Sequence, residues 1–174
     1  MSESYVLYQF GTDPFNNRYE DDEGRLAFSL YLASESPNLV IRLARHTPWA
    51  QYYPNVMGPE NAYYYFGPET SPGYIMYGNN LISLPMPHMS RQQREGSTSR
   101  YFTAQSGKYY KWRITPQRME CMDGRICLAV WEALASSEYD YDARLTVSPA
   151  ALRMITEIMT TLILNRMYLA RNWP

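Results

Sequence analysis

The sequence has little cysteine, little histidine and no excess of either charge. Its 174 residues include 2 Cys and 2 His, and 16 Lys and Arg residues stand against 17 Asp and Glu residues, which leaves a net charge of -1. Two cysteines are too few for a disulfide scaffold in a chain of this size. Nucleic-acid-binding proteins normally carry a basic excess, so the near-neutral charge argues against nucleic acid as a partner.

Targeting and membrane-spanning segments are also missing from the sequence. The first ten residues, MSESYVLYQF, lack the basic segment and the apolar run of a signal peptide. No Asn-x-Ser/Thr acceptor for glycosylation occurs, and no segment offers the roughly 20 apolar residues that a transmembrane helix needs. We therefore predict an intracellular, cytoplasmic protein with no transmembrane span, and we leave peripheral association with a membrane open.

Signatures of catalysis, metal binding and cofactor binding are absent as well. The sequence contains no P-loop, no G-x-G-x-x-G and no G-x-S-x-G motif. His46 and His88 stand alone, without the spacing of a zinc site and without support for a nucleophile–base pair. We predict no metal, no cofactor and no catalytic residues. A non-catalytic protein is favoured, and an enzymatic function is left open.

Tyrosine is abundant, and it lies in short segments of alternating polarity. Tyr contributes 17 of the 26 aromatic residues, which suits a sheet-rich protein because aromatic side chains pack well on pleated strands. The clearest alternation places Tyr110, Trp112 and Ile114 on one face of a strand. Residues 20–24 are predicted as a turn and residues 85–99 as a loop. Strands are predicted over residues 4–10, 25–32, 38–44, 74–77, 81–84, 101–104, 108–114, 118–122, 125–131 and 143–147.

One segment near the end of the chain predicts a helix instead. Ser148-Pro149 fits the N-cap and the first position of a helix. Residues 150–170 (AALRMITEIMTTLILNRMYLA) are apolar on all sides rather than along one stripe, which is typical of a helix buried on most of its surface. We therefore predict one mainly β domain over residues 1–174. Its strands, between residues 4 and 147, would form a closed antiparallel β-barrel around a central helix at 149–170.

The two cysteines flank a hairpin turn. A two-residue turn at Asp123-Gly124 would put the sulfur atoms of Cys121 and Cys127 on opposite faces of the hairpin. A three-residue turn with a bulge would instead pair the two residues directly and permit a disulfide. Because cysteine often behaves as a small buried hydrophobic residue, we favour free thiols.

Several segments of the chain match motifs of a known family. Residues 100–113 (RYFTAQSGKYYKWR) are similar to an fTa-DG-xYkW hairpin, residues 119–131 resemble an l-DG-xxvAxf hairpin, and residues 17–24 resemble an N-t-x-x-D-xx-G turn. Residues 145–171 are similar to a final strand and apolar helix. The chain thus resembles an uncharacterised fungal domain family of the tubby C-terminal-like (scramblase- and LURP-one-related) superfamily. The resemblance implies a barrel threaded by its helix. It also implies a lipid-linked role, because the superfamily includes phosphoinositide-binding tubby domains and scramblase-like proteins.

The segment from His46 to Pro72 departs from this family by its length and its aromatic content. It holds five Pro, and six Tyr or Phe residues follow Trp49, but it has no Lys or Arg. Proline excludes a long helix here, and residues 63–66 form the one plausible strand. We expect either a lid over the mouth of the barrel or an aromatic surface for a ligand or partner. The candidate contact residues are Trp49, Tyr52, Tyr53, Tyr63, Tyr64 and Tyr65.

Charge is distributed unevenly along the chain. Residues 91–125 contain eight basic and three acidic residues, a net charge of +5, whereas residues 1–25 contain two basic and six acidic residues, a net charge of -4. Arg and Lys bind phosphate groups, so the basic segment predicts a site for an anionic headgroup. Alternatively, its cations solvate an exposed face and pair with the acidic turn. The candidate residues are Arg100, Lys108, Lys111 and Arg113.

These features predict a non-catalytic binding protein that recognises an anionic phospholipid headgroup or a protein partner. One alternative is a small-molecule-binding or enzymatic barrel in which residues 46–72 act as a lid. A second alternative is a homo-oligomeric interaction protein that associates through its exposed aromatic residues.

Overall fold

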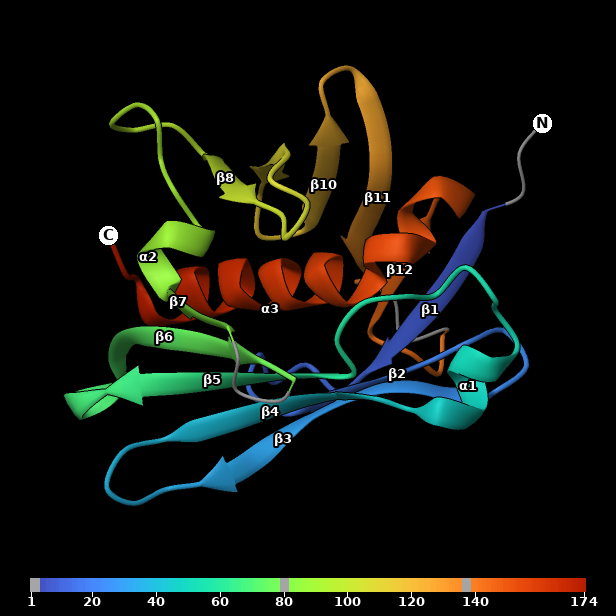
Figure 1. The fold of residues 1–174 in the computed structure, drawn as a ribbon, viewed down its shortest axis with the longest axis horizontal. Helices are drawn as coiled ribbons and strands as arrows, with labels where there is room; N and C mark the ends of the chain where they lie inside the picture. Colours follow the sequence, from blue (N-terminus) through green and yellow to red (C-terminus); the bar gives the residue numbers. More distant parts are fainter. Residues whose placement is uncertain (1–3, 79–81, 136–138) are drawn as a thin grey trace.

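Twelve antiparallel strands form one sheet, which confirms the prediction of a mainly β fold (Figure 1). The structure is a computed structural model and describes residues 4–78, 82–135 and 139–174. The strand order is β7-β6-β5-β4-β3-β2-β1-β12-β11-β10-β9-β8. Every neighbouring pair in this order is consecutive in the sequence except β1 and β12, and the consecutive strands β7 and β8 do not pair within the described residues. The strands are β1 (Tyr5–Phe10), β2 (Asn17–Glu20), β3 (Leu26–Ser34), β4 (Val40–Arg45), β5 (Asn61–Gly67), β6 (Ser71–Tyr77), β7 (Ile82–Pro85), β8 (Ser99–Thr103), β9 (Tyr109–Ile114), β10 (Arg118–Asp123), β11 (Ile126–Ala133) and β12 (Ala143–Val147).

The helix α3 (Ile155–Arg171) lies inside this curved sheet. In Figure 1 it runs between the strands β3–β6 on one side and the strands β8, β10 and β11 on the other. Thirteen of its 17 residues are buried, including Leu162 and Ile163 at 0% exposure. Each buried Leu or Ile contributes roughly 1.5–3 kcal/mol to folding. The predicted central helix is confirmed, with one correction: residues Pro149–Met154 form a 3-10 helix (η2) that precedes α3.

The strands form hydrogen bonds with polar groups of α3 in addition to packing against its apolar side chains. Tyr64 Oη on β5 donates to the carbonyl oxygen of Thr160 at 2.7 Å, and Trp112 Nε1 on β9 donates to Thr161 Oγ1 at 2.8 Å. Buried polar groups without partners destabilise a fold. These two hydrogen bonds therefore favour one position and one rotation of α3 relative to the sheet.

A further polar contact to the helix centres on Gln9 of β1. The Gln9 side chain is buried, and its Oε1 accepts hydrogen bonds from Tyr19 Oη (3.2 Å), Trp131 Nε1 (3.0 Å) and Arg166 Nη1 (3.3 Å). The Arg166 guanidinium also lies 4.7 Å from the centre of the Trp131 ring, a cation–π contact. One amide oxygen therefore joins β1, β2, β11 and α3.

Hydrogen bonding does not close the described strands into a barrel, which corrects the expectation of a closed one. The ends of the strand order are β7 and β8. β7 ends at Pro85, which has no N–H to donate. Arg91 occupies the outer edge of β8 by exchanging two backbone hydrogen bonds with Tyr101, at 2.9 and 2.8 Å. The short helix α2 (Met86–Met89) contacts β6, β7, β8 and α3. We call the region between β7 and β8 the seam.

The segment from His46 to Pro72 contributes strands to the sheet from Asn61 onward, and its residues before Asn61 contain no strand. It contains α1 (Thr47–Gln51), all of β5, the 3-10 turn η1 (Pro68–Thr70) and the start of β6. β5 pairs with β4 on one side and β6 on the other. The strand predicted at residues 63–66 is confirmed. The segment as a whole does not form a lid, because β5 and the start of β6 belong to the sheet.

Most other predicted strands agree with the structure to within three residues at each end. The sequence patterns miss three elements, of which one is the five-residue helix α1. β2 lies where no strand is predicted, and a bulge at Tyr19/Glu20 interrupts its pairing with β3. α2 falls in the predicted loop 85–99 and is only four residues long. The strands predicted at 74–77 and 81–84 also predict a hairpin turn at Gly78-Asn79-Asn80, of which Asn79 and Asn80 lie outside the described residues.

The hairpin of β10 and β11 carries both cysteines. Asp123 pairs with Ile126, so the turn begins at Gly124, whose φ of 58° favours glycine. Cys121 and Cys127 are not opposite each other in this register, which differs from both registers considered above. Both thiols are free, as predicted.

Replacing Tyr64 by Phe tests the polar anchoring of α3. Tyr64→Phe keeps the ring in the core but loses the hydrogen bond to Thr160, so we expect the free energy of unfolding in urea to fall by about 1 kcal/mol. Tyr63→Phe is the matched control, because the neighbouring residue of a strand faces the opposite side of the sheet. Its effect should stay within about 0.5 kcal/mol. Equal losses in the two variants would contradict this role of Tyr64.

Candidate functional site

A pocket of about 230 Å³ lies where the start of β8 meets the last turns of α3. We call it the Arg100 pocket. Its volume is several times the ~30 Å³ that a water molecule occupies in the liquid, so it has room for a small ligand. Its lining residues are Ser97, Thr98, Arg100, Ile114, Thr115, Pro116, Asn165, Tyr168, Leu169 and Trp173.

Strand register places Arg100 in this pocket. Arg100 pairs with Trp112, whose side chain is fully buried beneath the sheet, and paired residues of an antiparallel ladder project to the same face. The guanidinium therefore faces inward: Nη1 donates to the carbonyl oxygen of Ser90 at 3.2 Å, and the group lies 5.1 Å from the centre of the Tyr168 ring. Among the described residues, no carboxylate lies within ion-pair distance of Arg100.

Asn165 lines the same pocket from α3. Its side chain is 1% exposed, and Oδ1 accepts a hydrogen bond from Ser90 Oγ at 2.7 Å. Its Nδ2 has no partner among the described residues. A buried donor without an acceptor costs about 1–3 kcal/mol, so this amide is poised to meet an acceptor from a ligand. The sequence contains a signal for Asn165, because it is the one amide side chain in the segment 150–170.

Aromatic rings form the apolar wall of the Arg100 pocket. Tyr168 and Trp173 meet edge to face, with ring centres 5.0 Å apart and an interplanar angle of 88°. Trp173 also packs against Phe66 at 5.8 Å. Burial raises the pKa of Tyr168, and the nearby Arg100 opposes that shift. The pocket therefore combines a cation, an amide donor and an apolar surface, which suits an oxyanion with a hydrocarbon part.

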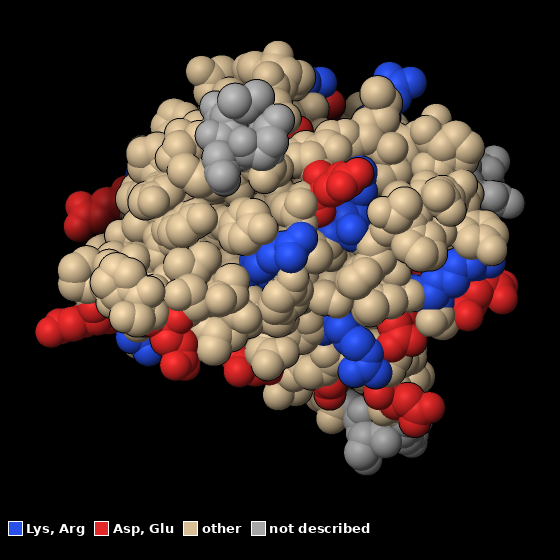
Figure 2. All heavy atoms as spheres, turned by 60° about the horizontal axis from the view of Figure 1, so that its bottom comes forward, with Lys and Arg blue, Asp and Glu red and all other residues tan. Residues whose placement is uncertain are grey.

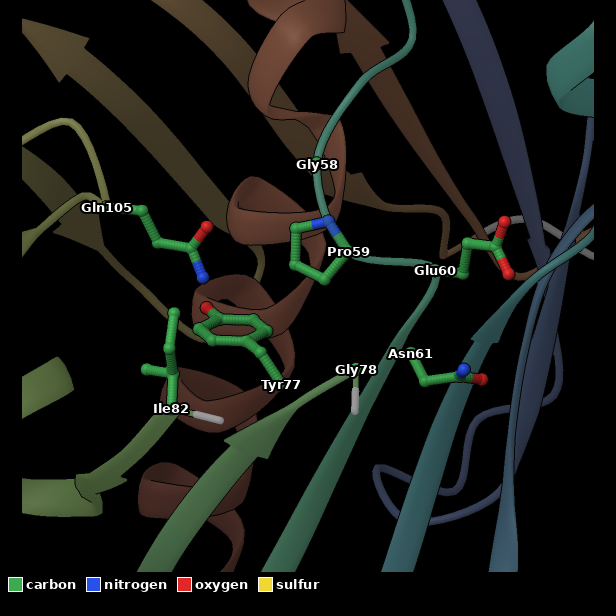
Figure 3. Close-up of a pocket in the computed structure, with 8 residues that line it drawn as sticks. All are labelled: Gly58, Pro59, Glu60, Asn61, Tyr77, Gly78, Ile82 and Gln105. Carbon is green, nitrogen blue, oxygen red and sulfur yellow. The ribbon is translucent and has the colours of Figure 1, made fainter. Parts of the chain in front are cut away.

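A second hollow opens at the seam. Two adjoining cavities, of about 580 and 250 Å³, share Tyr77, Ile82 and Gln105 among their lining residues. Figure 3 shows the larger cavity, in which the side chains of Tyr77 and Gln105 point toward each other while those of Glu60 and Asn61 point away, with α3 behind. We call the smaller one, which reaches α3, the seam cavity.

Glu157 lines the seam cavity from the first turn of α3. It is 9% exposed, and its Oε2 accepts a hydrogen bond from the backbone N–H of Gln105 at 2.9 Å. No Lys, Arg or His of the described residues lies within ion-pair distance of this carboxyl group. Burial raises its pKa, and the bond from Gln105 acts in the opposite direction. A buried acidic group at a cavity is a candidate for ligand binding.

The four cations predicted to bind phosphate do not form one site. Lys111 and Arg113 alternate with inward-facing residues of β9 and lie on the outer face of the sheet. Lys108 pairs with Asp123 on β10, with 2.6 Å between Nζ and Oδ2. Only Arg100 of this set lines a described pocket. On the face of the molecule seen in Figure 2, basic and acidic side chains are interspersed.

The aromatic residues predicted near the start of the segment 46–72 also separate. Trp49 is 2% exposed and packs against Phe28 and Tyr53, with ring centres 5.6 and 5.2 Å apart, so it belongs to the core. Tyr53 Oη donates to Asp21 Oδ2 at 3.4 Å. Tyr52 is exposed beneath the guanidinium of Arg25, which lies 3.8 Å from its ring centre.

The three consecutive tyrosines of β5 face two sides of the sheet. Tyr64 points inward to α3, so it cannot serve as a contact residue. Tyr63 and Tyr65 face outward, and Tyr65 stacks on Tyr74 of β6 with ring centres 4.9 Å apart. Together with Tyr31, whose ring contacts Arg42 as that of Tyr63 does, they form a strip on the outer face. We call Tyr31, Tyr63, Tyr65 and Tyr74 the outer tyrosine strip.

One side-chain pair was not expected from the sequence. Ser29 Oγ lies 2.8 Å from His46 Nε2, and both residues are half-buried. Burial and the nearby Arg42 lower the pKa of His46. A triad needs a carboxylate that orients the histidine, and among the described residues none lies within ion-pair distance of His46. The described residues also contain no group of three or more His, Cys, Asp or Glu arranged to hold a metal ion.

Comparison with known proteins leaves the function to be argued from these pockets. No family model, curated protein or solved structure matches the chain. The resemblance to tubby-like proteins therefore stays a prediction. Within the described ranges, no helix has both the length and the apolar character needed to cross a bilayer.

The raised pKa of Glu157 predicts a pH-dependent stability. The folded protein holds this proton more tightly than the unfolded chain, so the neutral carboxyl contributes stability below the unfolded pKa of about 4.3. That contribution is lost as the pH rises through the folded pKa. We expect Glu157→Gln to gain free energy of unfolding relative to wild type between pH 4 and pH 7, measured in urea. Glu120→Gln, on the outer face of β10, is the control and should not show this gain. Identical pH profiles of the free energy of unfolding for wild type and Glu157→Gln would show that the prediction is wrong.

Proposed function

We propose that the protein binds a small amphiphilic oxyanion, a carboxylate or phosphate ester with a short hydrocarbon part, in the Arg100 pocket. The proposal rests on the convergence of two groups on one cavity. The Arg100 guanidinium has no carboxylate partner among the described residues, and Asn165 Nδ2 has no acceptor there. A hydrogen bond between charged groups contributes about 1.5–3 kcal/mol, and the wall of Tyr168 and Trp173 favours an apolar substituent.

Two sources could supply this chemistry: the headgroup of an anionic phospholipid, or a free phosphate or carboxylate ester. The first source agrees with the lipid-linked role that the tubby-like resemblance implies. We propose with it that the fold is a tubby-like barrel whose ends are held together by α2 rather than by strand pairing. The protein would then work in the cytoplasm, and at a membrane surface when a lipid is the ligand. Of the four cations predicted from the sequence, this proposal retains Arg100.

Calorimetric titration with butyl phosphate and butyrate tests the site. We expect both to bind wild-type protein, and we expect 1-butanol, which lacks the charge, not to bind. Arg100→Gln should weaken binding about 10-fold or more, as the loss of a charge-assisted hydrogen bond of about 1.5–3 kcal/mol requires. Arg113→Gln is the matched control, because Arg113 lies on the outer face of the neighbouring strand, and it should leave the affinity unchanged.

Co-sedimentation with vesicles separates the two sources of the oxyanion. Binding to phosphatidic acid vesicles but not to phosphatidylcholine vesicles, lost in Arg100→Gln, would identify a lipid headgroup as the ligand. Binding of butyl phosphate without vesicle binding would identify a free ester. If neither probe binds, or if Arg113→Gln and Arg100→Gln lose binding equally, the proposed site is wrong.

The outer tyrosine strip supports a second candidate function, self-association. Tyr74 is 40% exposed and Tyr31 is 36% exposed, and a hollow of about 460 Å³ adjoins Tyr63, Tyr65 and Tyr74. Exposed aromatic surface of this kind is typical of protein–protein contacts.

Light scattering after size exclusion tests the second candidate. We expect a dimer or larger assembly for wild type and a monomer for the Tyr65→Ser/Tyr74→Ser double variant. Tyr109→Ser is the control, since Tyr109 is 67% exposed but lies on β9, outside the strip. A monomeric wild-type protein at all concentrations tested would rule self-association out.

A further inference from the structure

Two oxygen atoms at the seam cavity have no hydrogen-bond partner among the described residues, and one of them, Tyr77 Oη, is itself buried. Tyr77 is 2% exposed, and its Oη has no hydrogen-bond partner among the described residues. The neighbouring hydroxyl of Thr160 donates its proton to the carbonyl oxygen of Thr156 at 2.6 Å, so it does not donate to Tyr77 Oη. The carboxyl group of Glu157 receives one hydrogen bond, from the N–H of Gln105 to Oε2. Its Oε1 has no described donor.

The cavity beside these atoms is large enough for a small molecule. It encloses about 250 Å³ and adjoins the larger cavity of Figure 3. Its apolar walls include Ile82 and Leu84 of β7 and Met89 of α2. His88 is the basic residue among those that line it, and it is exposed and makes no ion pair with Glu157. The cavity therefore presents a carboxyl group that no cationic side chain of the described residues neutralises.

We propose that the seam cavity binds the ammonium group of a small primary amine, with Glu157 as its counter-ion and Tyr77 Oη as a second acceptor. An ammonium group has three N–H donors and no acceptor, which matches the two unpartnered oxygen atoms. A buried carboxylate strongly favours a cationic partner, whereas an anion would be repelled. The walls of Ile82, Leu84 and Met89 then receive a short alkyl chain.

This inference does not depend on the proposed function. The Arg100 pocket and the seam cavity share no lining residue, and they favour ligands of opposite charge. Failure of one site therefore leaves the other untouched.

Nuclear magnetic resonance of the full chain, labelled with ¹⁵N, tests the proposal with propylammonium chloride as the probe. The backbone amide of Gln105 is the reporter, because it donates directly to Glu157 Oε2. We expect a saturable shift of the Gln105 signal with propylammonium. 1-Propanol at the same concentration and NaCl at the same ionic strength should give no saturable shift.

Three variants locate the site. Glu157→Gln should weaken propylammonium binding at least about 10-fold, since the counter-ion is lost. Tyr77→Phe should weaken it by a smaller factor while leaving the free energy of unfolding unchanged or higher, because it removes a hydroxyl group that has no partner. Glu120→Gln, a carboxylate change away from the seam, should leave the affinity as in wild type.

The proposal is overturned if propylammonium gives no saturable shift, if 1-propanol gives an equal one, or if Glu157→Gln binds as well as wild type. Should Glu157→Gln fail to fold, Tyr77→Phe decides the matter. Unchanged affinity in a folded Tyr77→Phe protein would then also contradict the proposal.

Discussion

The enclosure of α3 is the constraint on which the rest of the structure depends. A helix that is apolar on all sides must be covered on all sides, and here one sheet curves around it. The cover must also satisfy polar groups of the helix, and Tyr64 and Trp112 do so from two different strands. The two ends of the described sheet do not pair, and side chains of α3 reach ligand-sized space at two places where the cover is incomplete. Glu157 reaches it at the seam, and Asn165 reaches it beyond the start of β8.

Much of the fold follows from simple sequence patterns, but the sites do not. Alternation identifies β9, and the all-round apolar run identifies α3. Ser148-Pro149 begins the 3-10 helix η2 instead, and Ser148 makes no side-chain cap. β5 is harder to read, because tyrosine occupies both its faces and hides the period of two. α2 has four residues, of which one is proline, and this is too short for any helical period. The sequence also groups Arg100 with Lys111 by proximity along the chain, whereas the register of β8 with β9 sends the two side chains to opposite faces.

Both cavities flank the same short element. Ser90, directly after α2, donates to Asn165 and accepts from Arg100. Met89, the last residue of α2, lines the seam cavity. The segment that replaces strand pairing between β7 and β8 thus contributes to a cationic pocket on one side and an acidic cavity on the other. Direct pairing of β7 with β8 would have left neither cavity, because the backbone of paired strands would then occupy the region that α2 fills.

The three hydrogen bonds that Gln9 Oε1 accepts affect which side chains α3 presents at both of its ends. An α-helix turns by about 100° per residue, so its rotational setting decides which side chains look outward through the two openings. The hydrogen bond from Arg166 to the amide oxygen of Gln9 on β1 helps to fix the rotation of α3 about its own axis. A chain with a different residue at position 9 could keep every strand and still present other helix residues at its openings, so altered selectivity could arise from a residue that lines neither cavity.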